Sequence, residues 1–483
     1  MRHPAFCLSV LSLISFLAAA ASAETLTVGP GKPYATPCAA VAAAHDNDVV
    51  EIDAQGAYGG DVCQIAKNGL TLRGVGGRAK IDAQGQSSGG KAIWVISGRD
   101  TTVENLEFSG ASVPDQNGAG IRQEGDNLTV RGCYFHNNDD GILAGASAQS
   151  QILIESSEFS QNGFGDGYSH NMYIGNVARF TLRASYSHDA KVGHLVKSRA
   201  AENYILYNRL TGESGSESYE LDLPNAGTSF VIGNLIEQGK DTENPGMLSY
   251  GLEGTQPGNP GHTLYLVNNT FVNDHPGGGT FVNVGAQVDQ PALLQNNIFS
   301  GPGTLTNQAS AISSTNFSGG DALLVDPVHF DYHLQAGSPC IDHGTAPGMA
   351  NGTALTPSEQ YEHPTSARSR VGVGTIDLGA YEFGAGNDPS PGATSGTSGA
   401  AGALNAQSGS ASATGGMAGA PSGASGASAQ PSGAKESTGC ACRAGGRGPA
   451  NASLLTLLLL SATAMLRRRP RSRASRLSAS ART

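Results

Sequence analysis

Short apolar segments return along the middle of the chain, each with four to six β-branched or aromatic residues bounded by Gly, Asn or Asp. The last residues of successive segments lie 23 to 35 positions apart. They are Phe108, Phe135, Phe159, Ser187, Leu210, Ile236, Phe271 and Phe299. Runs this short predict β-strands, because helices need longer stretches with a 3.6-residue period. A repeat of this length indicates a solenoid with one coil per repeat.

A second strand follows each segment, so every coil holds two or three strands. This pattern predicts an all-β fold, a right-handed parallel β-helix whose coils bury inward side chains on the coils above and below. Four segments carry Asn two residues before their end, and stacked amides form hydrogen-bonded ladders. These residues are Asn208, Asn234, Asn269 and Asn297. A β-sandwich is the alternative, but it has no reason to repeat the same turn residues at one spacing.

Residues 24–383 are expected to form this single β-helix domain. Solenoids need covered ends, and the amphipathic stretch at residues 37–45 is expected to be a helical cap that precedes the first strands. Cys38 and Cys63 both lie in this N-terminal part. They form either a disulfide between cap and first coil or two buried thiols.

Residues 1–23 begin with the charged Arg2, continue with a short apolar stretch and end with small residues at a cleavage site after Ala23. This order predicts an export signal peptide. Residues 384–438 are mainly Gly, Ala, Ser, Thr and Pro, a composition typical of a disordered linker. Residues 439–483 place Cys440 and Cys442 before an apolar, helix-forming run at 452–466 and an arginine-rich end.

The order of cysteine, apolar run and terminal arginines resembles the MYXO-CTERM sorting signal of myxobacterial surface proteins. The resemblance implies processing near Cys440 or Cys442, contact with the membrane and with sorting machinery, and display of the β-helix at the cell surface. An unprocessed membrane anchor is the alternative, and it also leaves the β-helix outside the cytoplasm.

The chain has a net charge of −11, and seven of its arginines lie in residues 467–483, so the rest of the chain is more acidic still. An acidic exported domain without a basic stripe excludes nucleic acid as a partner. We expect a monomer whose partner is a polysaccharide.

Residues 24–383 also resemble the pectate-lyase-like superfamily, in particular bacterial right-handed β-helix repeat proteins with stretches similar to residues 194–200 (HLVKSRA) and 222–225 (DLPN). The resemblance implies action on a carbohydrate, usually an acidic polysaccharide, in a groove along one parallel sheet. It leaves the reaction open, because this fold hosts lyases, hydrolases, epimerases, esterases and silent adhesins.

Strand alternation predicts which side chains face that groove. The expected outward positions on four successive coils are Tyr173, Lys197, Arg199, Glu220, Asp222 and Glu253. Coils about 4.8 Å apart would make these groups neighbours. Because a solvent-facing side chain contributes little to stability, Lys197→Ala is expected to leave the melting temperature nearly unchanged. The long step from Ile236 to Phe271 is expected to wall one side of the groove.

These groups suit β-elimination on a uronic acid, which needs a cation for the carboxylate, a base for the C5 proton and an acid for the leaving oxygen. The catalytic candidates are Lys197 and Arg199 as cation or base, and His170 and Tyr173 as proton donor. The alternative is a ladder of opposite charges on a solvated sheet.

Paired carboxylates can hold Ca²⁺ that acidifies the carbon, and Glu220 with Asp222 is the candidate pair. No other cofactor is expected. His194, Lys191 and Glu253 are the candidate substrate-binding residues.

Two other functions compete with a polysaccharide lyase. The first is a polygalacturonase-like glycoside hydrolase, a family that carries NTD, DD, GHG and RIK motifs. This chain has Asp139-Asp140 and Gly193-His194 but no NTD or RIK at the matching places. Asp139-Asp140 also has the composition of a turn. A polysaccharide-binding or adhesin solenoid suits surface attachment, but the cluster of basic residues speaks against it.

Overall fold

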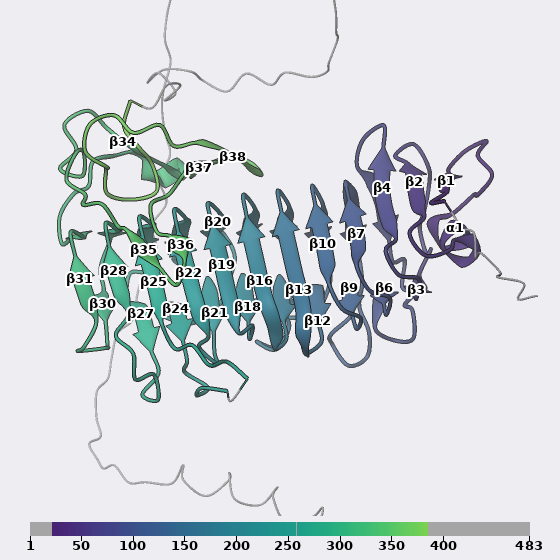
Figure 1. Cartoon of the computed structure of the whole chain (residues 1–483), viewed down its shortest axis with the longest axis horizontal. Coiled ribbons are helices and arrows are strands. Elements are labelled where there is room, and N and C mark those ends of the chain that lie inside the picture. Colours follow the sequence, from purple (N-terminus) through teal and green to yellow (C-terminus); the bar gives the residue numbers. More distant parts are fainter. Residues whose placement is uncertain (1–21, 257, 385–483) are drawn as a thin grey trace, which may run out of the picture. The chain divides into compact units, whose positions relative to one another are not determined.

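The computed structural model describes residues 22–256 and 258–384, which lie within one compact unit, Met1–Gly396 (Figure 1). The expected linker, Cys440, Cys442 and nearly all of the signal peptide lie outside the described residues. No helix in the described part of the chain is long and apolar enough to cross a membrane.

Three parallel sheets of twelve, ten and ten strands form a β-helix, as the repeat predicts. Sheet A contains β1 (Thr25–Val28), β2 (Val49–Asp53), β4 (Thr71–Val75), β7 (Thr101–Glu104), β10 (Leu128–Arg131), β13 (Ser147–Glu155), β16 (Val177–Arg183), β19 (Glu202–Leu206), β22 (Thr228–Ile232), β25 (Leu264–Val267), β28 (Leu293–Gln295) and β31 (Ile312–Ser314).

Sheet B carries the candidate site and contains β3 (Cys63–Ile65), β6 (Ala92–Ile96), β9 (Ala119–Gln123), β12 (Asp140–Ala144), β15 (Met172–Ile174), β18 (Val196–Ser198), β21 (Leu221–Leu223), β24 (Gly246–Tyr250), β27 (Thr280–Val284) and β30 (Thr304–Thr306). Sheet C contains β5 (Ala79–Asp82), β8 (Leu106–Ser109), β11 (Tyr134–His136), β14 (Glu158–Ser160), β17 (Tyr186–His188), β20 (Arg209–Thr211), β23 (Leu235–Gln238), β26 (Thr270–Asn273), β29 (Ile298–Ser300) and β32 (Phe317–Ser318). Each strand pairs with the equivalent strand of the next coil, so the coils stack in register.

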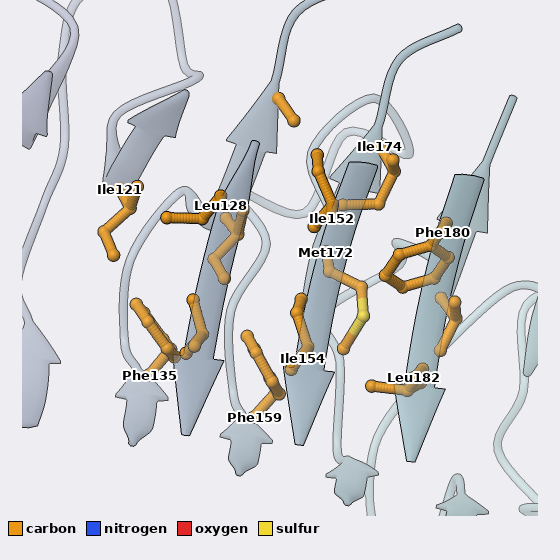
Figure 2. Close-up of a cluster of buried hydrophobic side chains, with 14 of the residues drawn as sticks. Ile121, Leu128, Phe135, Ile152, Ile154, Phe159, Met172, Ile174, Phe180 and Leu182 are labelled. Atoms are coloured by element: carbon orange, nitrogen blue, oxygen red, sulfur yellow. The ribbon is translucent and has the colours of Figure 1, made fainter. Parts of the chain in front are cut away.

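Like side chains stack on like in the core. Phe108, Phe135 and Phe159 are register partners on sheet C, and their rings stack with centroids 5.0 and 4.9 Å apart. Figure 2 shows Phe135 and Phe159 beside Ile154 and Met172 in this core. The recurring Phe at the end of each segment is therefore an inward position, where burial of the large ring stabilises the coil.

The predicted asparagine ladder is confirmed. The Oδ1 atoms of Asn234, Asn269 and Asn297 each accept the backbone amide of the ladder residue one coil earlier, all at 2.9 Å. The Nδ2 atoms of Asn208 and Asn234 also donate to the next Oδ1, at 3.0 and 2.9 Å. Asn316 continues the ladder by accepting from Asn297 at 2.8 Å. The ladder satisfies buried polar groups that the turn would otherwise leave unpaired.

The N-terminal end differs slightly from the prediction, because β1 precedes the helix and forms the first strand of sheet A. Helix α1 (Pro37–Ala43) is capped by Thr36 and buries Ala40 and Val41 against the first coils. Cys38 and Cys63 form a disulfide that joins this helix to β3.

A C-terminal extension packs beside the coils on the outer faces of sheets C and A. It contains β33 (Leu324–Asp326), the 3-10 helix η1 (Pro327–His329), β34 (Asp331–Leu334), β35 (Met349–Ala350), β36 (Thr353–Ala354), β37 (Glu359–Glu362) and β38 (Ser366–Ser369). Leu235 and Ile298 of sheet C share a buried cluster with Tyr332 and Tyr361 of the extension. Sheet B is left open (Figure 1).

The ladder makes a testable prediction about stability. Asn234→Ala leaves the Asn208 backbone amide without its acceptor and removes one partner each from Asn208 Nδ2 and the Ile205 carbonyl, and an unpaired buried group costs about 1–3 kcal/mol. We expect the free energy of unfolding in urea to fall by about 3 kcal/mol or more. Gln151→Ala, which removes an exposed amide on β13, is the control and should change it by less than about 0.5 kcal/mol. Equal effects of the two variants would show that the ladder is dispensable.

Candidate functional site

One outward column of sheet B carries most of the candidate side chains. Tyr173 pairs in register with Lys197, Lys197 with Asp222, and Asp222 with Ser249. On the other side of Tyr173 the column continues through Leu143 to Arg122. Within these strands, the side chains that face outward are the ones that strand alternation predicts from the sequence.

A groove of about 690 Å³ lies over this column around Tyr173. Its floor includes Arg122, Asp140, Leu143, Tyr173 and Arg199. Three loops wall it, at residues 110–118, at 161–171 and at 251–256 with 258–263, and they contribute Asp115, Gln116, Asn117, Asp166, Tyr168 and Gln256. The third loop falls in the long step after Ile236, as expected. Asn259 fixes this loop by accepting from Asn176 Nδ2 at 2.8 Å.

Arg199 and Tyr173 form a pair at the groove. Arg199 Nε donates to the Tyr173 hydroxyl at 2.9 Å, and Arg199 Nη1 contacts both Asn225 and the Glu253 carboxylate. Burial lowers the pKa of Arg199, but its hydrogen bonds to Glu253 and Tyr173 outweigh burial and raise it. Arg199 is therefore a fixed cation rather than a base.

Lys197 is held in a buried network rather than exposed to solvent. Its Nζ lies 2.9 Å from Asp222 Oδ2, 3.3 Å from Glu253 Oε1 and 3.5 Å from His194 Nε2. Only 10 % of the Lys197 side chain is exposed, so the prediction of a solvent-facing lysine is wrong. Glu253, on a loop and 48 % exposed, is the accessible member of the network.

His170 and His194 belong to a second ladder, at the N-terminal ends of the sheet B strands. Asp140 Oδ1 accepts the His170 amide at 2.8 Å, His170 Nδ1 accepts the His194 amide at 3.0 Å, and His194 Nδ1 accepts the Tyr219 amide at 3.3 Å. Burial, with the nearby Lys197 and Arg199 charges, lowers the pKa of His194 to about 3 and that of His170 well below its usual value. Both rings are neutral and carry their proton on Nε2.

Glu220 does not face the groove, and that prediction is wrong. The residue is fully buried, and burial together with Glu217 raises its pKa well above the usual value. Strand alternation fails here because β21 begins at Leu221, so Glu220 lies in the preceding turn. Asp222 Oδ1 accepts from Ser249 at 2.6 Å and Oδ2 pairs with Lys197. Glu220 and Asp222 therefore do not form the predicted Ca²⁺ pair, and calcium dependence itself stays a prediction.

Lys191 lies away from the groove. It is exposed and lines a separate cavity of about 300 Å³ with Asp189 and Ser214. Within residues 22–256 and 258–384, the one cluster with metal-ligand spacing is His188, Asp189 and Glu213. That cluster belongs to the sheet C side of the molecule, and its Glu213 is paired with Arg209 at 2.6 Å.

Three groove residues were not among the candidates predicted from the sequence. Arg122 lies two coils before Tyr173 and faces outward in the same column. Applying strand alternation to β9 as well would have identified it. Asp140 was interpreted as part of a turn, although it begins β12. Tyr168 is 86 % exposed on a groove wall, where an aromatic ring can stack on a sugar; nothing in its sequence context distinguishes it.

Comparison with known proteins supports the architecture. Residues 68–216 match a family model described as a right handed beta helix region. The pectate lyase Pel9A has a similar structure, with a TM-score of 0.50 and 13% identity over 75% of this chain and 97% of that one. A pectin methylesterase from Aspergillus niger gives a TM-score of 0.36 and 14% identity over 56% and 88%. No curated protein matches the chain. The fold is thus a right-handed β-helix of the pectate-lyase type.

The buried network predicts that Lys197 contributes to stability. Lys197→Met strands the buried Asp222 carboxylate, and breaking a buried ion pair costs about 3–5 kcal/mol. We expect urea unfolding to show a loss of about 3 kcal/mol, most of which Asp222→Leu restores in the double variant. Lys80→Met removes an exposed lysine that pairs with Glu107 at 3.2 Å and should lose less than about 1 kcal/mol. Similar losses for both lysines would contradict the network.

Proposed function

We propose that this protein binds an acidic polysaccharide in the sheet B groove and cleaves it by β-elimination. The observation that carries the proposal is the Glu253 carboxylate, whose Oε2 lies 2.7 Å from Arg199 Nη1 and whose Oε1 lies 3.3 Å from Lys197 Nζ. Two cations thus hold a carboxylate, and one of them, Arg199, lines the groove and binds Tyr173. Because Glu253 is half exposed on a loop, a uronate carboxylate can take its place.

The roles follow from this geometry. Arg199 and Lys197 neutralise the substrate carboxylate, which acidifies the C5 proton beside it. The Tyr173 hydroxyl, bonded to Arg199 Nε, is the group placed to take that proton, because the guanidinium stabilises negative charge on the phenolic oxygen. His170 and His194 position the strands through their Nδ1 atoms rather than meeting the substrate. Glu253 competes with the substrate carboxylate instead of binding the sugar.

Export and attachment to the cell surface are part of the proposal and rest on the two ends of the chain. Binding without catalysis remains the competing function, because the same two cations would also hold a polyuronate that is not cleaved. Reducing ends without unsaturated product would instead identify a hydrolase.

The reaction is tested with the whole protein and a panel of polyuronates and glycosaminoglycans. We put polygalacturonate first, because the fold is that of a pectate lyase. Absorbance of unsaturated uronates is followed in parallel with reducing ends and with retention on the immobilised polymer. We expect unsaturated product from at least one polyuronate. Retention without any product would reduce the function to binding.

Three substitutions test the assigned roles. Arg199→Gln and Tyr173→Phe should each lower kcat/KM at least about 100-fold on the active polymer. Arg179 and Tyr204 form a similar pair on sheet A, with the guanidinium 5.1 Å from the ring centre, so Arg179→Gln and Tyr204→Phe are matched controls that should keep full activity. Glu253→Gln should lower KM, since it removes the competing charge. Full activity in Arg199→Gln would exclude this site.

A further inference from the structure

Asp139 and Asp140 are neighbours in sequence with different environments. Asp139 Oδ2 accepts the amides of Val113 and Gly118 at 3.0 and 2.9 Å, which holds the loop at residues 110–118 that walls the groove. Asp140 instead lines the groove itself. Asp139 is therefore a structural residue, and Asp140 is available for chemistry.

The two oxygens of Asp140 also differ. Oδ1 accepts the His170 amide at 2.8 Å, which fixes the side chain in the second ladder. Oδ2 has no hydrogen-bond partner in the described part of the chain, although the residue is fully buried among the protein atoms. A buried carboxyl oxygen without a partner is unfavourable as a charged group. Because Asp140 lines the groove, Oδ2 is a buried oxygen without a partner at the groove floor.

The surroundings keep Asp140 protonated. Burial, together with the nearby Asp139 and Asp166 charges, raises its pKa to about 8, although the His170 amide and Arg122 act in the opposite direction. Asp139 directly precedes β12, Asp166 and His170 belong to the loop at 161–171, and Arg122 lies on β9. Below about pH 8 the carboxyl is neutral and its proton lies on the side of Oδ2.

We propose that Asp140 is the general acid of the groove and donates the Oδ2 proton to the glycosidic oxygen that leaves. The inference rests on the proposed β-elimination and adds a second catalytic residue to it. Tyr173 as phenolate takes the C5 proton, the C5–H electron pair forms the C4–C5 double bond, and the C4–O bond breaks. The leaving oxygen takes the proton of Asp140. Transfer of one proton from Tyr173 to Asp140 through water then restores the starting state.

Asp140→Asn tests this role, because the amide keeps an oxygen for the His170 N–H but cannot protonate a leaving group. On a polyuronate kcat should fall at least about 100-fold. On a uronate that carries an aryl ether at C4, whose aryloxide leaves without protonation, kcat should fall less than about threefold. Asp126→Asn is the matched control; it removes a carboxylate that accepts from Ser147 outside the groove and should leave both activities unchanged.

The pH profile of the unmodified protein supplies a second readout. Both substrates need Tyr173 as the base and only the polyuronate needs the protonated acid, so the ratio of kcat on the polyuronate to kcat on the aryl ether should fall as pH rises through about 8. Equal losses on both substrates in Asp140→Asn, or no loss on either, would overturn the assignment, as would a ratio of the two kcat values that does not change with pH. If Asp140→Asn does not fold, Asp140→Ser replaces it. Elimination of neither substrate by the unmodified protein is a different result, which refutes the proposed function and the acid with it.

Discussion

Every coil of this protein is hydrogen-bonded to the next in parallel register, and the remaining structure depends on that constraint. A residue that faces inward on one strand must meet the inward residue of the neighbouring strand, so the core grows as stacks such as Phe108, Phe135 and Phe159. The asparagine ladder holds the same register at the turns, where each Asn side-chain oxygen accepts a backbone amide of the coil before it. A slip of one residue would bury charges and unpair both systems.

The same register creates the candidate site. Outward residues of sheet B also stack, which brings Tyr173, Lys197 and Asp222 side by side without any long-range loop. Because opposite charges then lie on adjacent coils, they satisfy one another and can be buried at the surface of the sheet. The C-terminal extension packs on the later coils of sheets C and A, so sheet B is the sheet that it leaves free along its whole length.

The sequence predicted the coils, the asparagine ladder and the facing of Tyr173, Lys197 and Asp222, because these depend only on period and parity. It failed where the chain leaves a strand. Glu220 precedes β21, so parity does not apply to it, and Asp140 has the composition of a turn although it begins a strand. The burial of Lys197 could not be predicted either, since it depends on the Glu253 loop, which closes over it from a later coil.

The most direct test is a crystal structure of the Tyr173→Phe variant with a short oligouronate. The account predicts that the sugar chain lies along sheet B, with one carboxylate between Arg199 and Lys197 in place of Glu253 and a glycosidic oxygen toward Asp140 Oδ2. Glu253 still bound to Arg199, with density for the sugar elsewhere, would contradict it. Such density could lie over sheet A, or in the cavity that Arg209 of sheet C lines with Phe330 and Tyr361 of the C-terminal extension.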